Sequence, residues 1–243
     1  MGMRDGLNGD GLTRRIIMGQ IDDSLRRIGT DRIYLYFVHR LDDETPIEET
    51  LRSLDYLVRA GKVLYTGVSN WAAWQIAKSL GFSAREGLAS FACIQPMYNL
   101  TKRMAEVEIL PLALSEGLGV LPYSPLGGGL LTGKYTSANR PDQGRRVANA
   151  MYGKRYADDR YFDVAERFSP FASEMGVHPA SLAVAWVGAH PAITAPIIGA
   201  RNLDQLNGSL ASLDIDMTPE LWNEIAELSY HPGIATDRTE ALA

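Results

Sequence analysis

The stretch IYLYFVHR, residues 33–40, decides the fold class that this sequence predicts. Six apolar or aromatic residues, Ile33 to Val38, run without a break into His39 and Arg40. An unbroken apolar run of this length is typical of a strand that is buried on both faces, as in a parallel sheet. Because α/β barrels keep their chemistry at the carboxyl ends of such strands, His39 is a candidate functional residue.

Helix and strand signals alternate along the rest of the chain. Further strands are expected at 63–68, 91–95, 119–123 and 195–199. The first four strands begin 28 to 30 residues apart, a spacing typical of βαβ units. Helices are expected at 14–28, 46–60, 71–80, 107–116, 161–175, 179–189, 202–211 and 218–228. This order predicts an α/β protein, and no Gly-x-Gly-x-x-Gly follows a strand, which argues against a Rossmann fold.

Several of these helices carry start and stop signals. Thr13 can cap the first helix, and Thr45-Pro46-Ile47-Glu48 predicts a capping box with proline at the first helical position. Gly29 and Gly61 are the expected ends of the same two helices.

The composition is that of an ordinary globular protein, with 46% hydrophobic residues and a net charge of −5 over 243 residues. A mildly acidic chain is a poor candidate for binding nucleic acid or an anionic membrane surface. The single cysteine, Cys93, allows no internal disulfide and no cysteine-based zinc site. The first residues, MGMRDGLNGDG, contain no apolar signal region, and no stretch reaches the ~18 apolar residues of a membrane helix. We therefore expect a cytoplasmic protein without a bound metal.

Polar and glycine residues gather where the predicted strands end. They are His39, Ser69-Asn70, Gln95 with Tyr98-Asn99, Tyr123-Ser124-Pro125-Leu126 and Gly199-Ala200-Arg201. Each group alone has an ordinary structural explanation. Ser69 or Asn70 could cap the following helix, and Arg201 could pair with Asp204 at the surface. The order of the groups along the chain is more specific than any one of them.

Five segments closely resemble the aldo-keto reductase superfamily. They are LYFVHR, ETLRSLDYLVRAGKVLYTGVSNW, IQPMYNL, GVLPYSPLGGGLLTGKY and PIIGARNLDQL, and the match runs from residue 1 to about 230. The resemblance implies a single domain over 1–243 with the eight-stranded (β/α) barrel, or TIM barrel, of this superfamily. It also implies NADP(H) across the carboxyl ends of the strands, hydride transfer to a small-molecule carbonyl substrate, and a tyrosine as proton donor.

The resemblance assigns roles to the residues at the strand ends. It implies that Ser69, Asn70 and Gln95 hold the nicotinamide amide and that Tyr123 stacks on the nicotinamide ring. The cofactor-binding residues that it implies further along the chain are Ser124, Leu126 and Gly128 at the pyrophosphate, Lys134 beside them, Arg201 at the 2′-phosphate, Gln205 and Ser209 near the adenine, and Gly199. Family members often have asparagine where this chain has Ser209, which weakens that contact.

The segment 127–160 supports an anionic cofactor independently. It contains Lys134, Arg140, Arg145, Arg146, Lys154, Arg155 and Arg160 against Asp142, Asp158 and Asp159, a net charge of +4 in an acidic chain. Such a segment fits a basic clasp over a polyanionic cofactor. The alternative is a solvated loop without a function.

The resemblance also implies that three catalytic residues of the family are missing from this sequence. The family histidine that matches His39 orients the substrate carbonyl beside an aspartate, a tyrosine proton donor and a lysine that lowers the tyrosine pKa. Those three come from the first three β-α units, and this sequence starts after them. We therefore expect a barrel that is truncated at its amino terminus, with about five strands and impaired activity. Tyr34, Tyr36 and Tyr98 come without a Lys–Asp pair, and we assign the proton to none of them.

Two other functions stay open. One is a non-catalytic NADP(H)-binding or regulatory protein, like the potassium-channel β-subunits of the same superfamily. The other is a barrel enzyme without a cofactor. Because an incomplete barrel leaves strand edges open, self-association through the apolar edge at Ile33 to Val38 is a further expectation.

Overall fold

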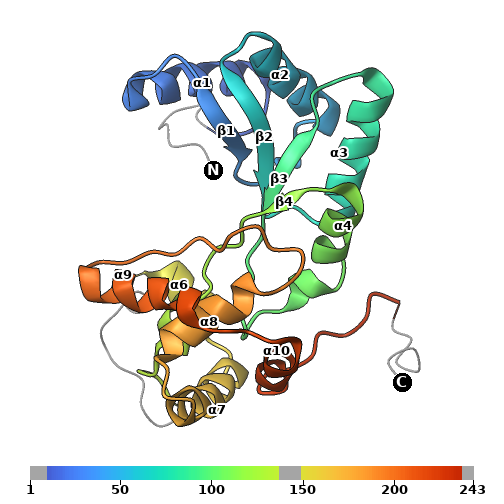
Figure 1. Ribbon diagram of the computed structural model, residues 1–243. Coiled ribbons are helices and arrows are strands. Elements are labelled where there is room, and N and C mark those ends of the chain that lie inside the picture. The colour runs from blue at the N-terminus through green and yellow to red at the C-terminus, as the bar shows by residue number, and fades with distance from the viewer. Residues whose placement is uncertain (1–9, 137–148, 237–243) are drawn as a thin grey trace. The chain divides into compact units, whose positions relative to one another are not determined.

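A computed structural model describes residues 10–136 and 149–236 of the chain (Figure 1). The chain divides into two compact units. We call them unit 1, Met1–Pro96 with Leu112–Gly119, and unit 2, Met97–Pro111 with Val120–Ala243. The expectation of a single domain over 1–243 stays a prediction.

Unit 1 alternates helices and parallel strands. Its elements are α1 (Arg14–Ile28), β1 (Ile33–Val38), α2 (Ile47–Arg59), β2 (Val63–Ser69), α3 (Ala73–Glu86) and β3 (Phe91–Gln95). The sheet order is β1-β2-β3-β4, where β4 is Gly119–Val120, and β1 and β3 each pair in parallel with β2. The predicted α/β class is confirmed, and the sheet is open. Among the described residues β1 pairs with β2 alone and is therefore an edge strand.

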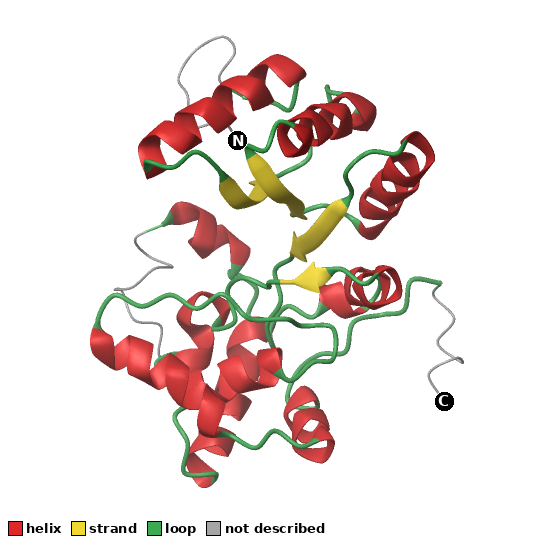
Figure 2. Cartoon of the chain, turned by 45° about the horizontal axis from the view of Figure 1, so that its top comes forward, coloured by secondary structure: helices red, strands yellow, loops and turns green. Residues whose placement is uncertain are grey.

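The core of unit 1 lies between the sheet and its helices. Figures 1 and 2 show α1, α2 and α3 on one side of β1, β2 and β3. The helices contribute side chains that are almost fully buried, namely Ile17, Ile21, Leu51, Leu54, Leu57 and Ile76. Val38, Val63 and Val68 of the strands are equally buried. The apolar stripes therefore hold the helices against the sheet, as the helical spacing predicts.

The predicted capping box at Thr45 is wrong. The N-cap of α2 is Pro46 without a side-chain cap, and the Thr45 hydroxyl donates instead to the Asp42 carboxylate at 2.5 Å. Asp42 also accepts the backbone N–H groups of Leu12 and Glu44, at 2.8 and 3.1 Å. The Thr45 hydroxyl is therefore used in a local side-chain hydrogen bond and does not cap the helix.

The glycine stop signals agree better with the structure than the start signals do. Gly29, directly after α1, and Gly61, which follows the Ala60 C-cap of α2, have left-handed φ values of 74° and 70°. Thr13 is the N-cap of α1, but its side chain makes no capping hydrogen bond.

Gly67 marks the tightest contact in the sheet. A Cβ atom at Gly67 would lie 2.8 Å from the Cys93 carbonyl oxygen, from Cys93 Sγ and from Phe37 Cε1. Cys93 is buried, and burial raises the pKa of its thiol to about 11. Strands β1, β2 and β3 therefore approach one another here without room for a side chain on β2.

Gly67→Ala is expected to lower the free energy of unfolding by about 1–3 kcal/mol, because the methyl group would push against backbone of the next strand. Urea denaturation followed by circular dichroism measures this. Gly81→Ala is the matched control, since Gly81 lies in α3 with open space around it. The control should raise the free energy of unfolding by about 0.5–1 kcal/mol through helix propensity. Equal effects of the two substitutions would contradict the prediction.

Unit 2 is mainly helical in its described part. Its elements are η1 (Met104–Glu106), η2 (Gly127–Thr132), α6 (Ala150–Arg155), α7 (Arg160–Glu174), α8 (Pro179–Gly188), α9 (Leu203–Leu210), η3 (Ala211–Asp214) and α10 (Pro219–Ala226). Helix α4 (Ile109–Glu116) has residues in both units. Every residue of α8 from Ala180 to Val187 is buried. Helix α8 is therefore the centre of the core of unit 2.

The last two predicted strands are shorter than expected. The strand at 119–123 is the two-residue β4, and the expected strand at 195–199 is only a single parallel bridge between Tyr123 and Ile197. Pro122 and Pro196 carry no N–H group to donate to a ladder, which prevents regular pairing there. The described residues therefore form four strands rather than about five.

Candidate functional site

The ends of β1, β2 and β3 are joined by one row of hydrogen bonds in unit 1. The Asn70 side-chain amide donates to the His39 carbonyl oxygen and to Ser69 Oγ, each at 2.9 Å. The Ser69 hydroxyl, which is buried, donates to the Gln95 carbonyl oxygen at 2.8 Å. Four predicted site residues from three strands are thus brought together at one edge of the sheet.

Asn70 does not cap helix α3, which was the alternative role for this residue. The N-cap of α3 is Ala72, whose N–H donates to the Gln75 side chain at 2.8 Å. Asn70 itself has a left-handed φ of 60°. A non-glycine residue in this region is uncommon, and asparagine is among the few that adopt it readily. The side chain of Asn70 therefore ties neighbouring strand ends together instead of starting the helix.

Two side chains in this group remain open to a ligand. The His39 ring is exposed and hydrogen-bonds to none of the residues that the structure describes. The half-buried Gln95 amide has no hydrogen-bond partner in the same described part of the chain. Their assignment to substrate and nicotinamide stays a prediction.

The turn from Ser124 to Gly129 in unit 2 contains four left-handed residues, Ser124, Gly127, Gly128 and Gly129. Ser124 has φ 60°, Leu126 is right-handed with φ −85° and ψ 10°, and Gly127 is left-handed with φ 57°. Gly128 and Gly129 follow with φ 67° and 104°. A right-handed residue before a left-handed one turns successive N–H groups to the same side, a geometry that can form a concavity for an anion. The Gly127 N–H already donates to the Ser124 carbonyl oxygen at 3.0 Å, and the Gly129 N–H donates to that of Leu126 at 2.9 Å. No residue in the described part of the chain accepts the Gly128 N–H, which lies between them. Among the described residues, Asn70 and Ser124 are the non-glycine residues with positive φ, and both are predicted site residues.

Tyr123 lies directly before this turn and contacts the basic segment. The Arg155 guanidinium lies 6.0 Å from the centre of the Tyr123 ring and 5.2 Å from that of Tyr152. Burial raises the pKa of Tyr123. Arg155 is thus part of a cation–π stack.

The rest of the predicted basic clasp is only partly described. Arg160 forms an ion pair with Asp158 at 2.6 Å, and Lys134 is exposed. Arg140, Asp142, Arg145 and Arg146 lie outside the described residues. The clasp stays a prediction.

The third predicted group lies around the start of α9. Gly199 and Arg201 are exposed, and the described residues contain no ion pair between Arg201 and Asp204. The Arg201 backbone N–H donates to Gln205 Oε1 at 3.1 Å. Ser209 is buried, and its hydroxyl donates to the Gln205 carbonyl oxygen at 3.1 Å. The Arg201 guanidinium is therefore available to a ligand, whereas the Ser209 hydroxyl is already bonded inside its helix.

Two of the tyrosines that the sequence leaves without a catalytic role are poor acids in the structure. The buried Tyr98 hydroxyl donates to Glu106 at 2.7 Å. Burial, and then the Glu106 carboxylate, raise the pKa of Tyr98 well above its usual value. Burial also raises the pKa of Tyr36. A phenol with a raised pKa gives up its proton less readily at neutral pH.

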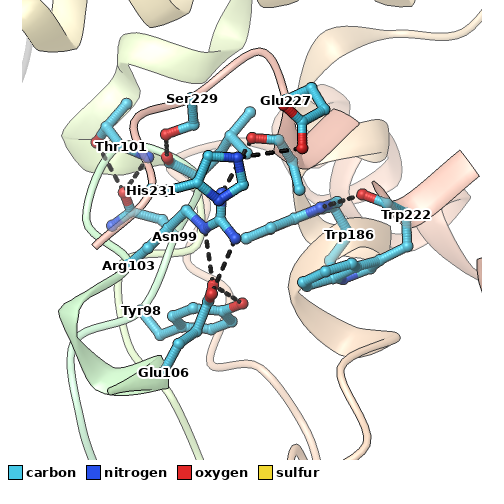
Figure 3. Close-up of polar contacts among 12 residues, drawn as sticks. Tyr98, Asn99, Thr101, Arg103, Glu106, Trp186, Trp222, Glu227, Ser229 and His231 are labelled. Atoms are coloured by element: carbon cyan, nitrogen blue, oxygen red, sulfur yellow. Dashed lines mark hydrogen bonds and ion pairs between the residues drawn. The ribbon is translucent and has the colours of Figure 1, made fainter. Parts of the chain in front are cut away.

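A buried ion pair fixes the loop 97–106 that follows β3 (Figure 3). The Arg103 guanidinium donates to both oxygens of Glu106, at 2.8 and 2.9 Å, and to the Ala226 carbonyl oxygen at 3.0 Å. It lies over the rings of Trp186 and Trp222, at 5.6 and 5.9 Å. This paired geometry satisfies a charge that would be costly to bury alone. The loop is therefore anchored to α8 and α10.

The same loop carries Asn99, which the sequence assigns no role. Asn99 is fully buried, and its side-chain amide donates to the Ser124 carbonyl oxygen at 3.0 Å and to the Tyr156 hydroxyl at 3.3 Å. The only sequence signal was its position beside Tyr98 after a strand end. Nothing in the sequence pointed to Tyr156 as the partner of Asn99.

Two other site types have no support in the described ranges. Residues 10–136 and 149–236 contain no group of three or more His, Cys, Asp or Glu side chains placed to hold a metal ion. No helix in these ranges combines the length and the apolar character needed to cross a membrane.

Comparison with known proteins identifies the family of the chain. The aldo/keto reductase family model matches residues 2–229. An uncharacterized oxidoreductase of Bacillus subtilis, YrpG, is 35% identical over 233 residues, which cover 96% of this chain and 69% of the relative. A probable voltage-gated potassium channel subunit beta of Oryza sativa subsp. japonica is 35% identical over 226 residues, 90% of this chain and 69% of the relative. The versiconal hemiacetal acetate reductase of Aspergillus parasiticus is 32% identical over 233 residues, 94% and 67% of the two chains.

Proposed function

Because the chain belongs to the aldo/keto reductase family, we propose that it binds NADPH and serves hydride transfer to an aldehyde or ketone, or the reverse alcohol oxidation. The observation that carries the proposal is the hydrogen-bonded row at the ends of β1, β2 and β3. This row leaves the Gln95 side-chain amide available to a ligand and places Asn70 and Ser69 next to Gln95. A carboxamide needs a donor and an acceptor at fixed positions, and the Gln95 side-chain amide offers both.

Residues of unit 2 suit the remaining parts of a phosphorylated dinucleotide by their own chemistry. The right-handed to left-handed step at Leu126 and Gly127 suits a pyrophosphate, and the exposed Arg201 suits a 2′-phosphate. The Tyr123 ring would stack on the nicotinamide, which supplies the hydride when the cofactor is bound. His39 would orient the substrate oxygen with its exposed ring.

We assign the proton to no residue of this chain. Tyr36 and Tyr98 both have a raised pKa, and the Tyr98 hydroxyl is already bonded to Glu106. The 243-residue chain should therefore bind the cofactor and reduce carbonyls only at a negligible rate.

Fluorescence titration with NADPH and a spectrophotometric assay with a generic aldehyde test the two parts separately. We expect saturable binding of NADPH, displaced by NADP⁺, and consumption of NADPH close to the rate without protein. A folded chain that fails to bind NADPH would refute the proposed function. Robust turnover would instead show that a proton donor is present among the 243 residues.

The second candidate is a cofactor-binding protein with a regulatory role. The observation in its favour is the 35% identity to the rice potassium channel subunit beta, equal to that of the Bacillus subtilis oxidoreductase. Both candidates require NADPH binding. Turnover by a longer chain that includes a family tyrosine and lysine would favour the enzyme.

A further inference from the structure

Asn99 lies at the centre of a buried polar cluster in unit 2. Its side-chain oxygen accepts the backbone N–H and the hydroxyl of Thr101, at 3.1 and 2.7 Å. Its side-chain nitrogen donates to the Ser124 carbonyl oxygen and the Tyr156 hydroxyl. Asn99 is 0% exposed, and these bonds use the whole amide. An amide satisfied in this way can adopt only one orientation.

The hydrogen bond from the Asn99 amide goes to Ser124, the strained residue of the neighbouring turn. Ser124 has a φ of 60°, which is unfavourable for a residue with a Cβ and persists only where surrounding contacts enforce it. The Asn99 amide holds the carbonyl of that residue. Asn99 therefore supplies a contact that can offset the cost of the left-handed conformation.

Tyr156 supports the same turn from another side. Its hydroxyl accepts from the Asn99 amide and donates to Met97 Sδ at 3.8 Å. A Cβ atom at Gly128 would lie 2.9 Å from Tyr156 Cε2, so the turn packs directly against the ring. Asn99 and Tyr156 thus contact both ends of the turn Ser124–Gly128.

The Asn99 anchor is itself held at two points in the chain. Figure 3 shows Asn99 and Thr101 in the loop that Arg103 ties to Glu106. The Asn99 backbone also forms an antiparallel bridge with Lys102, whose N–H donates to the Asn99 carbonyl oxygen at 2.9 Å. The loop therefore fixes the position from which Asn99 holds the turn.

We propose that Asn99, assisted by Tyr156, is a positioning residue that sets the backbone of the turn Ser124–Gly128 for a dinucleotide pyrophosphate. Neither side chain contacts the ligand; each acts through the turn. The inference rests on the proposed function, because the ligand is the cofactor named there. It goes beyond that function by assigning cofactor affinity to a buried amide outside the binding surface.

Asn99→Asp tests the inference with little change in shape. Aspartate keeps the oxygen that accepts from Thr101 but loses both donors and sets a carboxylate against the Ser124 carbonyl. We expect the Kd for NADPH to rise by roughly tenfold, as loss of one or two buried hydrogen bonds implies. Tyr156→Phe keeps the ring on Gly128 and removes only the hydroxyl, so we expect a smaller rise, roughly threefold.

Two controls separate positioning from loss of structure. Asn223→Asp makes the same chemical change at an exposed position in α10 and should leave NADPH binding unaltered. Adenosine 2′-monophosphate, measured by calorimetry, probes the Arg201 region without a pyrophosphate. Its affinity should stay within twofold of the unmodified chain in all three variants. A purely structural defect would weaken both ligands together.

Each outcome decides between the inference and the function on which it rests. If the unmodified chain binds NADPH and both Asn99→Asp and Tyr156→Phe bind it equally well, the positioning role is refuted and the function stands. If Asn99→Asp is unfolded by circular dichroism, Tyr156→Phe alone decides. If NADPH does not bind to the folded unmodified chain, the function and the inference fail together.

Discussion

Arg201→Ala is expected to raise the Kd for NADPH by roughly ten- to a hundredfold while the Kd for NADH hardly changes. The exposed guanidinium of Arg201 has no ion-pair partner among the described residues, so it can pair with a 2′-phosphate without first breaking another contact. A charged hydrogen bond is worth about 1.5–3 kcal/mol, which corresponds to this range of affinity. Fluorescence titration with both cofactors measures the ratio.

Arg167→Ala is the matched control for this loss of one positive charge. Arg167 lies exposed on α7, donates to the Asp163 carbonyl oxygen at 3.3 Å and should not affect either cofactor. Equal affinity of the unmodified chain for NADPH and NADH would contradict the assignment of Arg201. So would an unchanged preference in Arg201→Ala.

The elements of unit 1 could be predicted because their signals are local. The apolar run at 33–38 and the helical stripe of α2 each specify an element from adjacent residues, and both elements are confirmed. The expected burial of 33–38 on both faces is wrong, because Val38 alone in this strand is buried and Tyr34 is 72% exposed. The cap at Thr45 failed because Asp42, three residues earlier, offers its hydroxyl a closer partner. The strand expected at 195–199 failed because Pro196, inside the run itself, has no N–H group to donate to the ladder.

The strand-end part of the candidate site was also predictable, for a topological reason. Parallel strands end at the same edge of a sheet, so Ser69 and Gln95 meet across 26 residues of chain. The side-chain direction of Asn70 was not predictable. The same side-chain amide could either cap α3 or bond to the His39 carbonyl oxygen, and the sequence does not decide between the two.

The supporting contacts in unit 2 could not be predicted. Arg103 bonds to a carbonyl 123 residues away, and Asn99 bonds to a tyrosine 57 residues away. Such contacts depend on how helices pack, which periodicity does not encode.

As a 243-residue polypeptide the chain is expected to self-associate through the edge strand β1. Among the described residues this strand pairs on one side only, and it carries neither proline nor charge from Ile33 to Val38. Tyr34 on β1 and Tyr65 on β2 are 72% and 59% exposed, so aromatic surface lies beside the open backbone groups. An unprotected apolar edge is a template for pairing with a second chain. Sedimentation velocity over a range of concentrations should therefore show species larger than the monomer.

Tyr34→Lys should shift this association toward the monomer, because an added strand would have to desolvate a new ammonium group. A desolvation cost above about 1.4 kcal/mol raises the concentration needed for association by roughly tenfold or more. Trp74→Lys removes a comparably exposed aromatic side chain, 64% exposed, from α3 rather than from the edge. Its association should match that of the unmodified chain. If both lysine variants dissociate alike, association depends on exposed aromatic surface in general. If the unmodified chain is a monomer at every concentration, the edge of β1 is protected, and pairing through it must be abandoned.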